Sequence, residues 1–355
     1  MKNKLFFSIV MPAYGVENYI ENSVKSILNQ TVEDFEIIIV DDCSPDKTGE
    51  LADKLALLDN RISVIHLEKN GGVSNARNEG FKRVQGEYVF FMDPDDTIAS
   101  DLLSQIKDTL SVHPADVTVY GIREEYFDGD HNFAYDNKII FDDKYHYFTE
   151  QSELRKAVID LERLTMYGYP WNKIFSTEYV KNSGVEFRKI TLIEDIMFNA
   201  EIFQNISSLN ILPITPYNYK KRINESLTNK FVPQYFDLHR TRVKMLYDQQ
   251  KSWGTLGDYE KTVLANIYSR YIFSSLQRNC DERANMTHKD RKVWLKNLFN
   301  DDLWVSLSKY ATVNLSLQGI LSGFLKMKSI CLCLMAGRFI YTVKVKLPIV
   351  FSKLK

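Results

Sequence analysis

The sequence predicts an α/β fold with a mostly parallel sheet flanked by helices, followed by a C-terminal helical region. Strand and helix signals alternate through the first 120 residues, and each apolar strand signal ends at a polar cluster. From Pro233 onward the periodicity becomes helical, with many aromatic residues. Alternating strands and helices form parallel sheets with right-handed crossovers, and loops at the carboxyl ends of such strands bind ligands.

The elements follow from apolar runs and helical spacing. The run at 6–11 is apolar apart from Ser8, as expected for a strand covered on both faces. Ile20, Val24 and Ile27 then recur at the spacing of one helix face. A later helix over 192–206 opens with two acidic residues. The expected order is strand 6–11, helix 20–28, strand 35–40, helix 49–58, strand 62–66, helix 73–84 and strand 88–92.

The composition is that of a folded protein and argues against several classes. The net charge is −1, so no global preference for nucleic acid is expected. The four cysteines are too few and too unevenly spaced for a disulfide framework, and Cys331 and Cys333 lack the second pair of a zinc site. No apolar stretch reaches the ~18 residues that would span a bilayer. We therefore expect reduced thiols and a cytoplasmic protein.

Charge is distributed unevenly along the chain. Asp302 is the last acidic residue, and 303–355 contain eight Lys or Arg. The segment 315–355 alternates these cations with apolar clusters, which suits an interfacial segment on an anionic membrane. The alternative is a C-terminal helical lobe with a solvated basic face. The expected location is cytoplasmic, with peripheral binding at the inner face of the membrane.

Asp93-Pro94-Asp95-Asp96 follows the strand expected at 88–92. Three carboxylates in four residues repel one another unless a cation or solvent compensates their charge. Hard oxygen ligands suit Mn²⁺ or Mg²⁺, and such an ion can bridge to a diphosphate. The alternative is a solvated turn in which Asp96 caps a helix.

Weaker signals follow the other strands. Tyr14 could stack on a base, although a tyrosine there more often packs. Asp42 could bind a nucleoside or form part of a turn. Lys69-Asn70-Gly71-Gly72 could present backbone N–H groups to an anion at a helix start, or be a plain turn. Arg77 lies one turn further along that helix.

Taken in order, these segments resemble the family-2 glycosyltransferases of the GT-A fold. The resemblance covers about 7–106 and implies a GT-A type, Rossmann-like sheet. The segments that carry it are Ser8-Ile9-Val10-Met11-Pro12-Ala13-Tyr14, Ser26-Ile27-Leu28-Asn29-Gln30-Thr31, Ile39-Val40-Asp41-Asp42-Cys43-Ser44, Asn70-Gly71-Gly72-Val73-Ser74-Asn75-Ala76-Arg77-Asn78-Glu79-Gly80 and Asp93-Pro94-Asp95-Asp96.

The resemblance also implies roles for individual residues on the donor side. The residues implied to bind the nucleotide sugar are Pro12, Ala13, Tyr14, Glu17, Asp42, Asn70, Gly72, Arg77 and Asp93. Arg77 would help to organise the acidic loop. Asp95, together with Asp93, would ligate Mn²⁺ or Mg²⁺.

Two later segments resemble the family more thinly. Trp171, Asn172 and Lys173 lie in a segment similar to the family's acceptor side. Glu194-Asp195 is similar to its paired-acid motif, which implies acceptor contact for Glu194 and a catalytic-base role for Asp195. The alternative is a charged first helical turn, which the helix dipole also favours.

The basic run Lys220-Lys221-Arg222 departs from the family's pattern by its three consecutive cations. Lys221 and Arg222 are the candidates for diphosphate contact. The change to helical periodicity from Pro233 onward predicts a boundary near residue 230. The expected domains are a catalytic domain over 1–230, with a nucleotide-sugar half (1–115) and an acceptor half (116–230), and a helical region over 231–355.

The expected function is therefore inverting, metal-dependent transfer of a hexose from a UDP-sugar to an acceptor hydroxyl. Glycans, lipid-linked acceptors and glycoproteins remain open as acceptors, as does the identity of the hexose. A catalytically inactive, nucleotide-sugar-binding scaffold is the main alternative, but it would be expected to lack the carboxylates at Asp93, Asp95 or Asp195. A nucleotidyltransferase would place a basic, glycine-rich loop after the first strand, and a dehydrogenase would place G-x-G-x-x-G there; 12–17 show neither.

Overall fold

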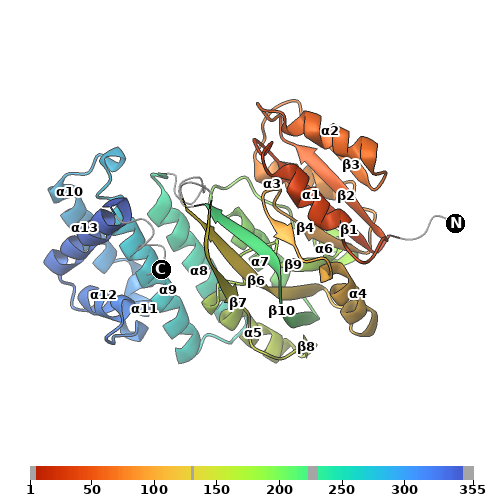
Figure 1. The fold of residues 1–355 in the computed structure, drawn as a ribbon. Coiled ribbons are helices and arrows are strands. Elements are labelled where there is room, and N and C mark those ends of the chain that lie inside the picture. Colours follow the sequence, from red (N-terminus) through yellow and green to blue (C-terminus); the bar gives the residue numbers. More distant parts are fainter. Residues whose placement is uncertain (1–4, 129–131, 223–230, 347–355) are drawn as a thin grey trace. The chain divides into compact units, whose positions relative to one another are not determined.

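The computed structural model describes residues 5–128, 132–222 and 231–346 (Figure 1). Their contacts divide them into two compact units. The first unit contains the described residues up to Phe127 together with 132–221, and the second contains Asp128 and the described residues from Arg222 onward. The domain boundary expected near residue 230 lies outside the described residues.

Four parallel strands form the first half of the sheet. They are β1 (Phe7–Ala13), β2 (Phe35–Asp41), β3 (Ile62–His66) and β4 (Tyr88–Phe91), in the order β3-β2-β1-β4. Every residue of β1 is buried, as its continuous apolar run predicts. The strands begin and end within two residues of their expected bounds, and their carboxyl ends meet at one edge of the sheet.

Three helices connect these strands: α1 (Ile20–Leu28), α2 (Thr48–Leu58) and α3 (Val73–Phe81) (Figure 1). Helices α1 and α2 contact each other, whereas α3 packs on β1 and β2. The approach of α3 depends on Gly80, because a Cβ there would lie 2.5 Å from Val10 Cγ1. This close packing sets the start of α3 beside the ends of β1 and β2.

Antiparallel strands complete the sheet, so the expectation of a mostly parallel sheet holds for its first half only. The full order is β3-β2-β1-β4-β9-β6-β10-β5, with β7 beside β6 and β8 beside β10. The pairs β4–β9, β9–β6, β6–β7, β10–β8 and β10–β5 are all antiparallel. The added strands are β5 (Thr97–Ile98), β6 (Val117–Phe127), β7 (Phe133–Ile139), β8 (His146–Phe148), β9 (Lys173–Ser176) and β10 (Leu209–Arg222).

Four further helices among the described residues belong to the first unit. They are α4 (Leu102–Val112), α5 (Gln151–Arg163), α6 (Thr177–Ser183) and α7 (Glu194–Phe203). The helix expected at 192–206 is α7, and it does open with the two acidic residues.

The second unit is helical in its described part. Its long central helix α9 (Asp258–Arg278) contacts α8 (Tyr235–Ser252), α11 (Asp302–Leu307), α12 (Leu317–Lys326) and α13 (Ile330–Lys346). Helix α10 (His288–Phe299) packs against α13. Gly337 brings α13 close to α9, since a Cβ there would lie 2.9 Å from Leu276 Cβ. None of the described helices is both long enough and apolar enough to cross a bilayer.

Candidate active site

Asp42 joins two of the loops at the strand ends. It lies just beyond β2, and its backbone N–H donates to Ala13 O of β1 at 2.9 Å. Its buried carboxylate accepts hydrogen bonds from the backbone N–H groups of Gly71 and Gly72, each at 2.7 Å. Gly72 has a φ of 88°, in a region that favours glycine. The Asn70 amide donates to Asp42 O at 3.3 Å, so Asp42, Asn70 and Gly72 form one site.

The loop after β1 is fixed to the loop after β2. Glu17 accepts a hydrogen bond from Lys47 N at 3.0 Å, and Glu17 N donates to Asp46 Oδ2 at 3.1 Å. Tyr14 keeps about half of its surface exposed, at 51%. An exposed ring on an anchored loop, beside the Asp42 carboxylate loop, is suited to stacking on a flat base.

Pro12 and Ala13 are nearly fully buried within β1. Their side chains are packed in the sheet, so any contact with a nucleoside would come from their backbone groups at the end of the strand. The sequence correctly places them at this edge, but it does not reveal that their side chains are enclosed.

The acidic loop after β4 is held by its last carboxylate. Asp96 is fully buried and accepts hydrogen bonds from Tyr217 Oη and from Lys220 N, both at 2.8 Å. Burial, followed by the charges of Asp95 and Asp93, raises the pKa of Asp96 well above its usual value. Asp96 caps no helix, because α4 begins at Leu102. The alternative of a solvated, capping turn is therefore wrong for Asp96.

Asp93 and Asp95 remain partly exposed while Asp96 is buried. Two carboxylates presented on one short loop match what Mg²⁺ or Mn²⁺ takes when substrate phosphates and water supply the other ligands. Within the described residues, no group of three or more His, Cys, Asp or Glu could hold a metal by itself. The donor set therefore fits an ion whose coordination is completed by a diphosphate.

Arg77 connects the acidic loop to α7. One guanidinium nitrogen donates to Asp93 Oδ1 at 3.0 Å, and another donates to Asp195 Oδ1. The Arg77 side chain is 3% exposed and lies against the Phe187 ring, 5.1 Å from its centroid. Burial lowers the pKa of Arg77, but the charges of Asp195 and Asp93 outweigh burial and raise this pKa.

The acidic pair at the start of α7 lies in a partly buried environment. Burial raises the pKa of Asp195, and Arg77 opposes that rise. Burial, together with the charge of Asp195, raises the pKa of Glu194 to about 7. Burial and the charge of Asp93 therefore favour the protonated form of Asp195, whereas Arg77 and Lys173 favour its carboxylate.

The three residues expected to contact an acceptor are buried. Trp171 is 2% exposed and stacks between Tyr169 and Tyr217, at ring distances of 4.5 and 4.6 Å. Asn172 Nδ2 donates to Met166 O at 3.0 Å.

Lys173 is enclosed in the same way. Its ammonium donates to Met166 O, Tyr169 O and Asn172 Oδ1 at 2.6–2.8 Å. Burial lowers the pKa of Lys173 well below its usual value. The contacts of these three residues favour a positioning role for the segment rather than direct side-chain contact with an acceptor.

Lys220, which precedes the two basic candidates, joins this end of β10 to the acidic loop through its bond to Asp96. Lys221 forms an ion pair with Glu124 and donates to Tyr126 Oη at 3.2 Å. Contact between Lys221 and a phosphate would therefore compete with Glu124. Arg222 is the last described residue of β10 and falls in the second unit.

Three features of the site were not predicted from the sequence. Tyr217 begins the aromatic and basic segment that resembles the family's diphosphate side, but its hydrogen bond to Asp96 spans 121 positions and no local pattern marks it. The contact of Glu124 with Lys221 spans 97 positions and is equally hidden. Leu192 has a φ of 70°, an uncommon conformation for a leucine, two residues before Glu194. Such strain is found near functional sites, and no sequence signal predicts it for leucine.

Comparisons with known proteins show similarity to glycosyltransferases. The profile of "Glycosyl transferase family 2" matches residues 8–173. "Uncharacterized glycosyltransferase EpsJ" of Bacillus subtilis is 30% identical over 225 residues, which is 62% of each chain. The B. subtilis "Putative teichuronic acid biosynthesis glycosyltransferase TuaG" is 42% identical over 102 residues, 29% of this chain and 40% of TuaG. The matched stretches thus cover less than two thirds of either relative.

Among solved structures, S. aureus TarS 1–349 in complex with UDP-GlcNAc superposes with a TM-score of 0.65. It is 21% identical and covers 95% of this chain and 92% of the TarS chain. At this identity the likeness establishes the fold, including the C-terminal helices. Over residues 8–173, the chain is similar to glycosyl transferase family 2.

Proposed function

We propose that the protein transfers a hexose from a UDP-sugar to an acceptor hydroxyl, with inversion at the anomeric carbon. The observation that carries the proposal is the bridge through Arg77, which joins the donor-side carboxylate Asp93 to the candidate base Asp195. One buried cation thereby places a carboxylate that would hold the metal of the diphosphate next to the group that would accept the acceptor's proton.

The proposed reaction is a single displacement. The acceptor oxygen bonds to the anomeric carbon while the bond from that carbon to the diphosphate oxygen breaks. Asp195 takes the proton of the acceptor hydroxyl, and the nucleoside diphosphate leaves with the electron pair of the broken bond. Because attack comes from the face opposite the leaving group, an α-linked donor gives a β-linked product.

Asp95 and Asp93 would hold Mn²⁺ or Mg²⁺ in this proposal. The ion would supply Lewis-acid neutralisation of the diphosphate. Asp96 and Tyr217 keep the loop that carries both carboxylates in place, since Tyr217 Oη lies 3.4 Å from Asp93 N as well as 2.8 Å from Asp96. Arg77 balances part of the local negative charge.

The proposed nucleoside pocket lies between Tyr14 and the Asp42 loop. The Tyr14 ring would stack on the base. Each carboxylate oxygen of Asp42 keeps a lone pair after its bond to Gly71 or Gly72, so Asp42 would accept a hydrogen bond from an N–H group of the base. The complex of TarS with UDP-GlcNAc supports a UDP-sugar as the donor class.

The name of TuaG supports a cell-envelope polysaccharide as the acceptor class. We further propose a cytoplasmic enzyme that associates with the inner face of the membrane, which would bring it to lipid-linked acceptors. The eight cations and absent carboxylates of 303–355 support this location.

Release of nucleotide from a panel of UDP-, GDP-, dTDP- and CMP-sugars tests the proposal, with Mn²⁺ and with a chelator. The expected result is chelator-sensitive release of UDP from one UDP-hexose. Asp95→Asn should abolish that release, whereas the matched control Asp101→Asn, at an exposed aspartate before α4, should not. No release from any donor, together with no thermal shift by any nucleotide, would contradict the proposal. A thermal shift without release would favour the inactive scaffold or an enzyme that needs its acceptor.

A further inference from the structure

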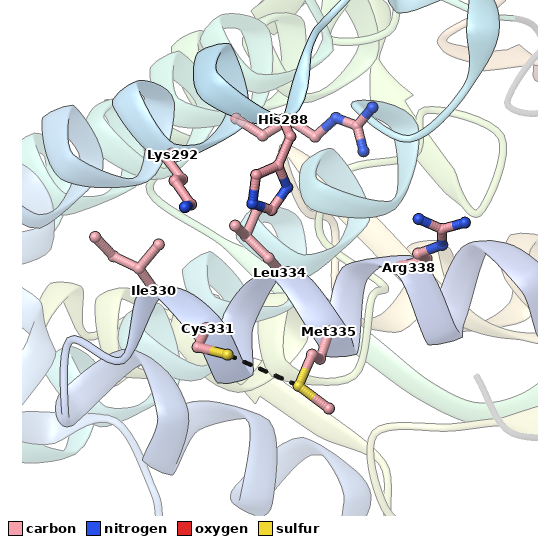
Figure 2. A pocket seen from close by; sticks show the side chains of 8 residues that line it. His288, Lys292, Ile330, Cys331, Leu334, Met335 and Arg338 are labelled. Carbon is pink, nitrogen blue, oxygen red and sulfur yellow. Dashed lines mark hydrogen bonds between the residues drawn. The ribbon is translucent and has the colours of Figure 1, made fainter.

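A cavity of about 520 Å³ lies in the second unit, between α10 and α13. Its walls have two chemical characters. His288, Lys292 and Arg338 supply cationic or titratable groups, and Ile330, Leu334 and Met335 supply apolar ones. Figure 2 shows Ile330 and Leu334 on α13 pointing toward the side of His288 and Lys292 on α10. The volume lies within the range of ligand pockets, about 300–1,000 Å³.

The cations of this cavity are available to a ligand. In the described part of the chain, no ion pair involves His288, Lys292 or Arg338, and all three are exposed. The neighbouring Arg291 is held by the chain itself, since its guanidinium donates to Met286 O at 2.8 Å. An anion in the cavity would therefore meet side chains that need not leave another partner.

The surrounding surface is apolar on one side and poor in negative charge. Cys333, Ala336 and Gly337 form the buried side of α13. Met335 and Phe339 lie one turn apart on another side and are 63% and 64% exposed. Met327, in the turn before α13, is 64% exposed. From Leu303 to Lys355 there is no Asp or Glu, so every charged side chain of α12 and α13 is basic.

We propose that the cavity between α10 and α13 binds the phosphate headgroup of an anionic membrane lipid, in an extension of the membrane association proposed above. The phosphate lies beside Lys292, Arg338 and His288. The glycerol and upper acyl carbons lie against Ile330, Leu334 and Met335, and Phe339 enters the interface beside them. A free phosphate would use only the cationic wall, and the exposed apolar wall favours an amphiphile.

Co-sedimentation with vesicles tests this site. The vesicles are phosphatidylcholine with or without phosphatidylglycerol, and the variant is the full chain carrying Lys292→Glu and Arg338→Glu. The control is Lys54→Glu with Lys251→Glu, which makes the same change in net charge at two exposed lysines away from the cavity. Each basic side chain at an anionic surface contributes roughly a factor of five to binding. The cavity variant should thus bind phosphatidylglycerol vesicles about 25-fold more weakly or worse, and the control nearly as well as the unmodified protein.

Equal binding by the cavity variant and the control would overturn the headgroup site, even if the basic tail still brings the chain to vesicles. A second variant, Met335→Ser with Phe339→Ser, keeps every charge and should also weaken binding. A different ligand is indicated if inorganic phosphate raises the Tm of the unmodified protein but not that of the Lys292→Glu, Arg338→Glu variant, and neither protein binds vesicles. The ligand is then not a lipid. Nucleotide release from soluble donors should be unchanged in both variants, which separates this inference from the transfer reaction.

Discussion

Replacing Arg77 with leucine is expected to destabilise the first unit strongly. Arg77 is 3% exposed and forms ion pairs with two carboxylates, Asp93 and Asp195. Removing one partner of a buried ion pair costs about 3–5 kcal/mol, because the remaining charge stays buried without compensation. For a domain of about 150–250 residues, each kcal/mol lowers Tm by about 2–4 °C. The expected decrease in Tm for Arg77→Leu is therefore about 6–20 °C.

Differential scanning fluorimetry at neutral pH measures this change, and Arg123→Leu is the matched control. Arg123 also pairs with an aspartate, Asp136, but its side chain is 42% exposed, so its loss should cost less than about 1 kcal/mol. A second arm adds Asp93→Asn and Asp195→Asn to Arg77→Leu. If uncompensated charge causes the loss, the triple variant should be more stable than Arg77→Leu alone. Equal Tm values for Arg77→Leu and Arg123→Leu would refute the reasoning.

Three further predictions concern groups outside this bridge. Tyr217→Phe should cost about 1–3 kcal/mol in urea unfolding, because Asp96 loses a donor while buried; no loss would mean that water replaces the hydroxyl. Lys173→Met should cost at least about 2 kcal/mol, since three oxygens lose their donor. A raised KM for acceptor without a loss of stability would instead indicate direct contact. Burial, followed by the charge of Arg242, lowers the pKa of His239 in the folded protein to about 3. The unfolded chain, with a pKa of about 6.5, therefore binds a proton that the folded protein does not, so the free energy of unfolding decreases as pH falls below about 6.5. His239→Phe keeps the stack on Tyr271 and should remove about 2 kcal/mol of the decrease between pH 6.5 and pH 5, measured by denaturant unfolding; an unchanged decrease would contradict this.

The first half of the fold could be predicted because its signals are local. The run over 35–40 is apolar apart from Glu36, which predicts a strand covered on both faces, and Asp41 and Asp42 mark its end. The antiparallel second half could not be predicted in the same way. Strands β6 and β10 gain their partners from distant parts of the chain, and no short-range pattern states which strands pair.

The candidate site likewise has features that local sequence patterns predict and others that depend on contacts between distant residues. The sequence predicts that Asp42, Asn70 and Gly72 lie at one edge of the sheet, as the structure confirms. Asp42 follows one strand and the other two follow the next, and parallel strands end at the same edge. It does not reveal that Arg77 meets Asp195, 118 positions away, because that contact depends on how α3 and α7 approach. Burial is equally hidden: Lys173 resembles a surface cation by type, yet three oxygens enclose its ammonium.

The turnover of Asp195→Asn tests the central claim most directly. Asparagine keeps the size of the side chain and one oxygen for Arg77, but it cannot take a proton from the acceptor hydroxyl. With a donor identified from the panel, kcat for transfer should fall about 10²–10⁴-fold while the affinity for UDP stays unchanged. Retention of most of the transfer activity by Asp195→Asn would contradict the account, because another group would then be the base.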